Sequence, residues 1–279
     1  MNNLQRKRIK ASQLVIIGTI CGDIIGSWYE WQSTKRYDFK LLSEYSRFTD
    51  DTVCSVAIAD ALVRNIPFDI NLKYWCKRYP RAGYGGMFSS WIYSFIKGPY
   101  NSWGNGSAMR VSSIGAFANN LDDCLSLAKQ SAEITHNHPE GIKGAQAVAS
   151  SIFLALHGYN KNKIKNYIEN QFAYNLSRRY EEIQHTYQFE ISCQKSVPES
   201  IIAFLESSDY ESAVRKAVAV GGDADTMAAI AGGIAAAYYG EIPQFILKEC
   251  LNKLPNDIKN VINQFNTVLN TNILPTNQQ

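Results

Sequence analysis

Residues 221–240 read GGDADTMAAIAGGIAAAYYG, and this stretch decides which fold the chain can adopt. From residue 226 onward it consists almost entirely of Ala, Gly and larger apolar or aromatic residues, a pattern that predicts a helix buried on all sides. Small side chains let a neighbouring helix approach closely, whereas glycines inside a helix cost about 1 kcal/mol each relative to Ala. We therefore expect another segment of the chain to pack tightly against Gly232 and Gly233.

Helical patterns extend over most of the remaining chain. Apolar residues recur at helical spacing in four further segments, and two prolines mark the starts of two more helices near the C-terminus. The four segments are residues 51–64, 121–134, 140–156 and 211–220, and the two prolines are Pro243 and Pro255. The sequence therefore predicts an all-α fold, a single compact many-helix domain over residues 1–279, in which residues 1–10 and 271–279 form flexible tails.

Segment 160–195 departs from this pattern. It is the most polar and least periodic part of the chain, so we expect loops there. Within it, Tyr187, Phe189 and Ile191 alternate with polar residues, which predicts a short strand or an extended segment.

The composition excludes several classes of protein. Hydrophobic residues make up 46% of the 279 residues and the net charge is only +3, so a disordered chain and a general nucleic-acid or membrane binder are not expected. The six cysteines are scattered with no C-x-x-C pair, which is typical of reduced, buried thiols and argues against a disulfide scaffold or a zinc ribbon.

The N-terminal region superficially resembles a targeting segment. Basic residues precede an apolar run, but Cys21-Gly22-Asp23 stands where a signal-peptide cleavage site would lie. The apolar stretch 14–31 carries Asp23 and Glu30, and residues 227–239 are too few to span a bilayer. We expect neither a signal peptide nor a transmembrane segment, and we expect the protein to act in the cytoplasm or after delivery into another cell.

Acidic residues cluster at the predicted starts of two helices, in Thr49-Asp50-Asp51-Thr52 and in Asp223-Ala224-Asp225-Thr226. One interpretation is helix capping, because Thr and Asp cap helices well. However, neighbouring carboxylates on buried helices repel one another. A hard divalent cation such as Mg²⁺ or Mn²⁺ would relieve that repulsion with the oxygen ligands it prefers. The spacing alone leaves both interpretations open.

A glycine-flanked turn, Gly104-Asn105-Gly106-Ser107-Ala108-Met109-Arg110, is a second candidate site. Its free backbone N–H groups would suit phosphate or ribose oxygens, although a lone turn of this kind is a weak signal. His136 and His138 form an H-x-H pair, which we interpret as a turn with local hydrogen bonds in preference to a metal site.

Five motifs in order along the chain resemble those of the ADP-ribosylglycohydrolases. They are G-D-x-x-G (22–26), T-D-D-T (49–52), G-N-G-S-A-M-R (104–110), S-A-x-x-T-H (131–136) and G-G-D-x-D-T (221–226). Each motif is weak alone, but the ordered set is specific and covers nearly the whole chain. The resemblance implies an all-α domain that holds two divalent cations, Mg²⁺ or Mn²⁺, and removes ADP-ribose from modified side chains.

The resemblance also implies roles for individual residues. The expected metal ligands are Thr49, Asp50, Asp51, Asp223, Asp225 and Thr226. The expected ADP-ribose-binding residues are Gly104, Asn105, Gly106, Ser107, Met109 and His136. Catalysis is expected to depend on Glu30, Asp50, Asp51 and Asp225. Ala224 departs from the family pattern, which usually has a hydroxyl residue there.

The expected reaction is hydrolysis of the bond at C1″ of the distal ribose, first of all from arginine, the commonest target of bacterial members. Serine, an acetyl ester and a nucleic-acid base remain alternative linkages. Two alternative functions also remain: a non-catalytic ADP-ribose-binding or structural protein, and a two-metal enzyme that cuts the pyrophosphate. The expected partners are an ADP-ribosylated protein as substrate and ADP-ribose as product, with no membrane or nucleic acid, and we expect a monomer.

Overall fold

The computed structural model describes residues 3–95 and 98–273, and within them the regular secondary structure is entirely helical, without a β-strand. The α-helices are α1 (Asn3–Gly26), α2 (Asp50–Arg64), α3 (Phe68–Arg78), α4 (Gly86–Tyr93), α5 (Ser112–Phe117), α6 (Leu121–Glu133), α7 (Pro139–Leu156), α8 (Lys161–Phe172), α9 (Tyr180–Thr186), α10 (Cys193–Leu205), α11 (Tyr210–Ala219), α12 (Ala224–Tyr239), α13 (Gln244–Asn252) and α14 (Asn256–Ile273). A 3₁₀ turn, η1, spans Asn105–Ser107. The all-α prediction is confirmed.

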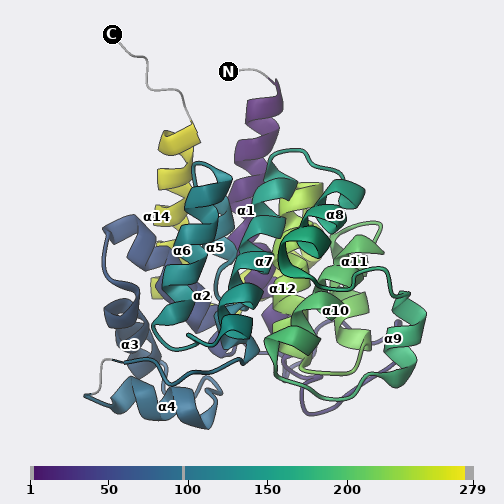
Figure 1. The fold of residues 1–279 in the computed structure, drawn as a ribbon, viewed down its shortest axis with the longest axis horizontal. Coiled ribbons are helices and arrows are strands. Elements are labelled where there is room, and N and C mark those ends of the chain that lie inside the picture. Colours follow the sequence, from purple (N-terminus) through teal and green to yellow (C-terminus); the bar gives the residue numbers. More distant parts are fainter. Residues whose placement is uncertain (1–2, 96–97, 274–279) are drawn as a thin grey trace.

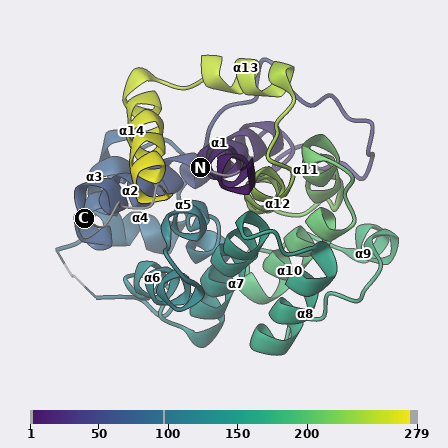
Figure 2. The same cartoon turned by 90° about the horizontal axis from the view of Figure 1, so that it is seen from above.

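Helices α1 and α12 lie side by side at the centre, and the other helices surround them (Figures 1 and 2). Glycines make this contact possible. A Cβ atom at Gly22 would lie 2.1 Å from the Ala228 carbonyl oxygen, and one at Gly232 would lie 2.6 Å from that of Gly18. The expected close approach at the glycines of α12 is therefore confirmed, and its partner is the N-terminal helix.

The helices expected from periodicity are present, with ends that differ by at most a few residues. The expectation of loops over residues 160–195 is wrong for much of that segment, which contains α8, α9 and the start of α10. Ile164, Ile168 and Phe172 are buried and recur every four residues, so α8 packs on one narrow apolar stripe in an otherwise polar sequence. Residues 187–191 are extended but form no strand; the only pairing nearby in the described chain is an isolated bridge between Gly104 and Ser192.

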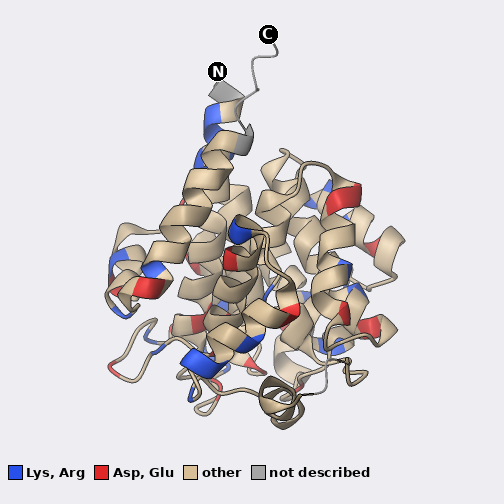
Figure 3. Cartoon of the chain, turned by 90° about the vertical axis from the view of Figure 1, so that its left-hand side faces the viewer, with Lys and Arg blue, Asp and Glu red and all other residues tan. Residues whose placement is uncertain are grey.

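The expected tails are partly helical. Residues 3–10 form the first turns of α1, because the helical pattern continues into the buried part of that helix, and residues 271–273 end α14. Residues 1–2 and 274–279 lie outside the described residues. Arg6, Lys7 and Lys10 are exposed on the outer turns of α1, and acidic and basic residues intersperse over the rest of the chain (Figure 3).

One described helix, Gln5–Gly26, has the length and apolar composition of a membrane span. However, 78% of its most apolar window is buried inside the protein, as the contact with α12 requires. Its apolar character is accounted for by its position in the core.

Candidate active site

The acidic residues come together where α1, α2 and α12 meet. A Cβ atom at Gly26 would lie 2.3 Å from the Ala224 carbonyl oxygen, so the C-terminal end of α1 touches the first turn of α12. This contact brings Asp23 of α1 close to Asp225 of α12. The first turn of α2 completes the cluster with Asp51.

Asp23 holds the start of α2 in place. Its Oδ2 atom accepts hydrogen bonds from the Thr49 and Thr52 backbone N–H groups, at 2.9 and 3.1 Å. Its Oδ1 atom accepts from the Thr49 hydroxyl at 2.7 Å, and the Thr52 hydroxyl also donates to the carboxylate. Asp23 is fully buried and received no role in our sequence analysis. One feature of the sequence could have indicated its role, because Asp23 is a carboxylate inside an otherwise apolar stretch. Burying a carboxylate is costly unless it is hydrogen-bonded.

Two groups of three carboxylates have ligand atoms within 4.8 Å of one another among the described residues. Asp23, Asp51 and Asp225 form one group, and Glu30, Asp223 and Asp225 form the other. Asp225 belongs to both, so the two groups are adjacent. None of these carboxylates makes a salt bridge in the described chain.

The electrostatics of the cluster favour a bound cation. Burial, followed by repulsion from Asp225, raises the pKa values of Asp51 and Asp223 well above their usual range. The same two causes raise the pKa values of Asp23 and Glu30 to about 7. In addition, the Asp51 Oδ1 atom is buried and has no hydrogen-bond partner. A buried oxygen without a partner among repelling carboxylates fits a divalent cation, for which such oxygens are natural ligands.

A cavity of about 520 Å³ opens beside this cluster. Glu30, Asp50, Asp51, Asp223 and Asp225 line its acidic wall. The turn at η1 forms an adjoining wall, joined to the acidic one because the Asn105 side-chain amide donates to Asp223 Oδ2 at 2.7 Å. Exposed apolar side chains complete the cavity: those of Met87, Phe189 and Ile191.

Most of the expected ligand residues lie at this cavity. Thr226 lines it and donates from its hydroxyl to Asp51 Oδ2 at 3.2 Å, whereas Thr49 is the N-cap residue of α2 and does not line the cavity. Asp50 lines the cavity but belongs to neither three-carboxylate group.

The expected ADP-ribose-binding residues are brought together with one exception. Gly104, Asn105, Gly106, Met109 and His136 all line the cavity. Ser107 does not; its buried hydroxyl donates to the Gly141 carbonyl at 2.7 Å and fixes the turn against α7. His138 caps α7 by accepting from the Glu140 N–H group, as the expected turn requires.

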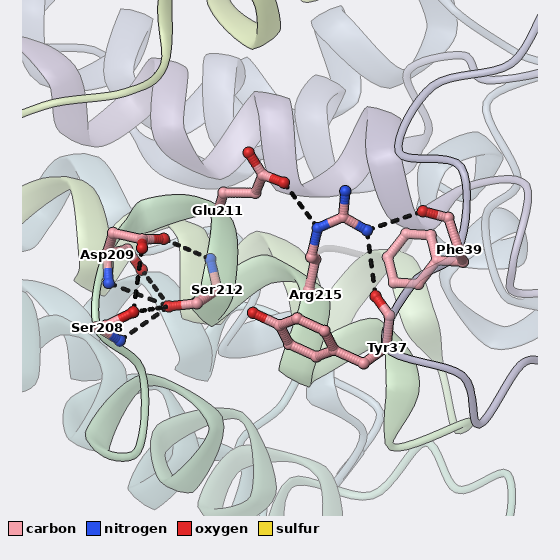
Figure 4. A network of polar contacts seen from close by, with 7 residues as sticks. All are labelled: Tyr37, Phe39, Ser208, Asp209, Glu211, Ser212 and Arg215. Carbon is pink, nitrogen blue, oxygen red and sulfur yellow. Dashed lines mark hydrogen bonds and ion pairs between the residues drawn. The ribbon is translucent and has the colours of Figure 1, made fainter.

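The loop between α1 and α2 carries Glu30, and α11 anchors this loop (Figure 4). The Arg215 guanidinium donates to the carbonyl oxygens of Tyr37 and Phe39, at 3.1 and 2.8 Å, and pairs with Glu211 at 2.7 Å. At the start of α11, Asp209 and Ser212 form a capping box. The long loop is therefore tied to a well-capped helix.

The fold and the site define a class of protein: an all-α protein with a buried acidic centre beside a cavity large enough for a nucleotide-sized ligand. The family model for ADP-ribosylglycohydrolase matches residues 1–273. The chain belongs to the ADP-ribosylglycohydrolase family.

Known relatives are distant but cover most of the chain. ADP-ribosylhydrolase ARH3 from Homo sapiens is 24% identical over 87% of this chain and 90% of its own length. ADP-ribosylarginine hydrolase Tri1 from Pseudomonas putida is 23% identical over 81% of this chain and 69% of its own length. A solved structure described as an ADP-ribosylglycohydrolase-related protein complex has the same fold, with a TM-score of 0.74 and 23% identity over 95% of this chain and 99% of that one.

Proposed function

We propose that the protein is a divalent-cation-dependent hydrolase that releases ADP-ribose from a modified protein side chain, with ADP-ribosylated arginine as its main substrate. The observation that carries the proposal is the pair of three-carboxylate groups sharing Asp225 beside the 520 Å³ cavity. The names of the relatives support it, because two of them are an ADP-ribosylhydrolase and an ADP-ribosylarginine hydrolase.

The proposed cofactor is two Mg²⁺ or Mn²⁺ ions. The proposed ligands are Thr49, Asp50, Asp51, Asp223, Asp225 and Thr226. Of these, Asp51, Asp223 and Asp225 belong to the two three-carboxylate groups, and Glu30 lies beside them in the second group. When bound, such ions hold sugar hydroxyls, stabilise developing negative charge and lower the pKa of water. Asp23 already accepts hydrogen bonds from Thr49 and Thr52, so we assign it to holding the first turn of α2 in position.

The proposed reaction breaks the bond between C1″ and a guanidine nitrogen. Water supplies a hydroxyl group to C1″, and a proton goes to the departing nitrogen. Glu30 is half-buried, and in the metal-free protein its pKa is raised to about 7, mainly by burial. A carboxyl group with a pKa close to the working pH is well suited to donate that proton.

The acidic wall also suits the leaving group. Protonated guanidine is a cation, and the half-buried carboxyl of Glu30 lies near the buried carboxylates of Asp223 and Asp225. The carboxylate that Glu30 becomes after donating its proton attracts a cationic guanidinium more than a neutral serine hydroxyl.

The test is a panel of defined substrates linked through arginine, through serine and through an acetyl ester, each with chelator and with added Mg²⁺ or Mn²⁺. We expect metal-dependent release of free ADP-ribose, fastest from arginine. Fast release from serine alone would contradict the arginine assignment. Formation of AMP and ribose phosphate would indicate pyrophosphate cleavage, and no product from any substrate would support a non-catalytic binder.

A further inference from the structure

Trp31 is an exposed aromatic residue next to the proposed proton donor. It follows Glu30 in the loop between α1 and α2, and it is 75% exposed. A single exposed apolar side chain is ordinary on a protein surface. The contacts of this tryptophan, however, tie its position to the active site.

The Trp31 side chain reaches the Glu30 carboxyl group. Burial, followed by repulsion from Asp225, raises the pKa of Glu30, and a hydrogen bond with the Trp31 side chain opposes that rise. The only polar group of a tryptophan side chain is the indole N–H, which can only donate. The indole nitrogen therefore lies beside the carboxyl group whose oxygen comes within 4.8 Å of ligand atoms of Asp223 and Asp225.

The faces of the Trp31 ring are not covered by cations of the described chain. Lys and Arg residues lie over several other aromatic rings, but none of the described ones lies over Trp31. Trp31 also stacks on no other described aromatic ring. An indole that donates from its edge and is largely exposed leaves a face open to solvent.

Trp31 lies at the edge of the site and not inside it. Glu30 lines the cavity, whereas Trp31 does not. With ADP-ribose in the cavity, the modified side chain runs from C1″ beside Glu30 outward to the protein that carries it. Trp31 is therefore placed to contact that side chain instead of the nucleotide.

The arginine of the proposed substrate brings its guanidinium to the same place. The nitrogen that receives the proton from Glu30 must lie within hydrogen-bond distance of that carboxyl group. The indole nitrogen is bound to the same carboxyl group, so the guanidinium and the ring are neighbours. A guanidinium is planar and cationic, and it is attracted to an indole face within about 6 Å of the ring centre.

We propose that Trp31 is a specificity-determining residue whose indole face receives the guanidinium of the ADP-ribosylated arginine while Glu30 protonates the departing nitrogen. This assignment rests on the proposed function, which supplies the position of the bond that breaks. A serine hydroxyl or an acetyl ester brings no cation to the ring, so Trp31 favours arginine-linked substrates over both.

Two variants that both lack the indole N–H isolate the aromatic face. Trp31→Phe keeps a ring, and Trp31→Leu keeps only an apolar side chain. For a peptide that carries one ADP-ribosylated arginine, we expect KM to be about two- to fivefold higher in Trp31→Leu than in Trp31→Phe, the scale of a cation–π contact at an exposed site, with similar kcat. Phe245→Leu, at an exposed aromatic residue of α13, should keep the wild-type KM. Equal KM values in the two Trp31 variants would overturn the proposal.

Binding is measured separately by calorimetry in Glu30→Gln protein, in which we expect release to be slow. In this background, Trp31→Leu should bind the arginine-linked peptide about two- to fivefold more weakly than Trp31→Phe. The two variants should bind a serine-linked peptide and free ADP-ribose with equal affinity. The same loss for free ADP-ribose would mean that Trp31 contacts the nucleotide, and it would overturn the assignment to arginine.

These measurements keep the failure of the two proposals apart. Release from arginine that is the same with Phe and with Leu at position 31 would reject the role of Trp31 and leave the proposed function standing. The opposite result is tighter binding of the arginine-linked peptide with Phe than with Leu, without release by the wild type. That result would support the role of Trp31 and reject the proposed function.

Discussion

Glu30 lies in the loop after α1, and its carboxylate comes within 4.8 Å of ligand atoms of both Asp223 and Asp225. It is the least buried member of the two carboxylate groups. A group that meets both solvent and the buried carboxylates is well placed to exchange protons, whereas the fully enclosed carboxylates are better placed to hold cations.

Replacing Glu30 by Gln removes the proton donor and keeps the size of the side chain. We expect kcat for release of ADP-ribose from arginine-modified protein to fall by about 10²–10⁴-fold, the usual scale for loss of a general acid or base. The binding of ADP-ribose should change little. Mass spectrometry of the modified protein over time measures the rate. Glu44→Gln, an exposed residue of the same loop, is the matched control, and equal rates in the two variants would exclude Glu30 as the donor.

The raised pKa values of Asp23 and Glu30 make the stability of the metal-free protein depend on pH. Both groups have folded-state pKa values of about 7, above the usual value near 4 for a carboxyl, so the folded state binds more protons between those limits. The stability that protonation provides is complete below the unfolded-state pKa and is lost as the pH rises through 7.

We therefore expect the melting temperature of chelator-treated protein to rise as the pH is lowered from 8 to 5. Each additional proton bound by the folded state contributes a slope of about 1.4 kcal/mol per pH unit. With saturating Mg²⁺ the dependence should weaken or reverse, because the positive charge of a bound cation favours the ionised form of the carboxyl groups near it. Calorimetric scans at several pH values provide the measurement, and identical pH profiles with and without metal would contradict a cation at these carboxylates.

At the scale of elements, the contact between α1 and α12 positions the site. Gly22 and Gly26 bring the end of α1 against the first turn of α12, and this places Asp23 beside Asp225. If nothing packed against these positions, replacing each glycine by alanine would stabilise α1 by about 1 kcal/mol, because alanine has the higher helix propensity. The close backbone contact outweighs that local preference.

Gly22→Ala should destabilise the protein, although alanine is the better helix former. Its Cβ would lie 2.1 Å from a backbone carbonyl oxygen of α12, so the two helices must separate. We expect the free energy of unfolding to fall by about 1–3 kcal/mol, the usual cost of overpacking. Denaturant titration measures the change. Gly86→Ala is the control, because nothing lies within 4 Å of its Cβ position, and a loss of stability no larger in Gly22→Ala than in this control would contradict the contact.

At the scale of the whole molecule, the acidic centre joins three parts of the chain that are distant in sequence: α1 with the loop that follows it, the start of α2, and the start of α12. Carboxylates from these parts repel one another when no cation is bound. A ligand that binds the folded state alone stabilises the entire fold by mass action. Metal binding should therefore be visible in global unfolding and not only in activity.

We expect Mg²⁺ or Mn²⁺ at about a hundred times its dissociation constant to add about 2.7 kcal/mol to the free energy of unfolding. That corresponds to a rise in melting temperature of about 5–10 °C for a protein of roughly this size. Asp225→Asn should abolish this response and raise the melting temperature of the metal-free protein, because it removes a charge common to both carboxylate groups. Asp122→Asn, at an exposed position of α6, controls for loss of one charge. A wild-type metal response in Asp225→Asn would exclude Asp225 as a ligand.

The sequence by itself determined the helices and the residues from which the centre is built. The apolar period over residues 51–64, 140–156 and 226–239 predicted α2, α7 and α12, because helix formation depends on neighbours three and four residues apart. It also predicted that acidic residues begin two of the helices. The apolar period did not predict α8, because only a few apolar residues recur at helical spacing in that polar segment.

Only the tertiary structure decided how those residues meet. It turned Ser107 away from the cavity, hydrogen-bonded Asp23 to the first turn of α2, and brought Glu30 to Asp223 across nearly two hundred residues. It also set the protonation of the site, because the pKa values depend on burial and on charges from other helices. The physical reason is the range of the interactions. Helix capping and apolar periodicity involve residues within one or two helical turns, so the sequence shows them directly. Burial and Coulomb interactions depend on distances between residues far apart in the chain, and those distances exist only once α1 has packed against α12.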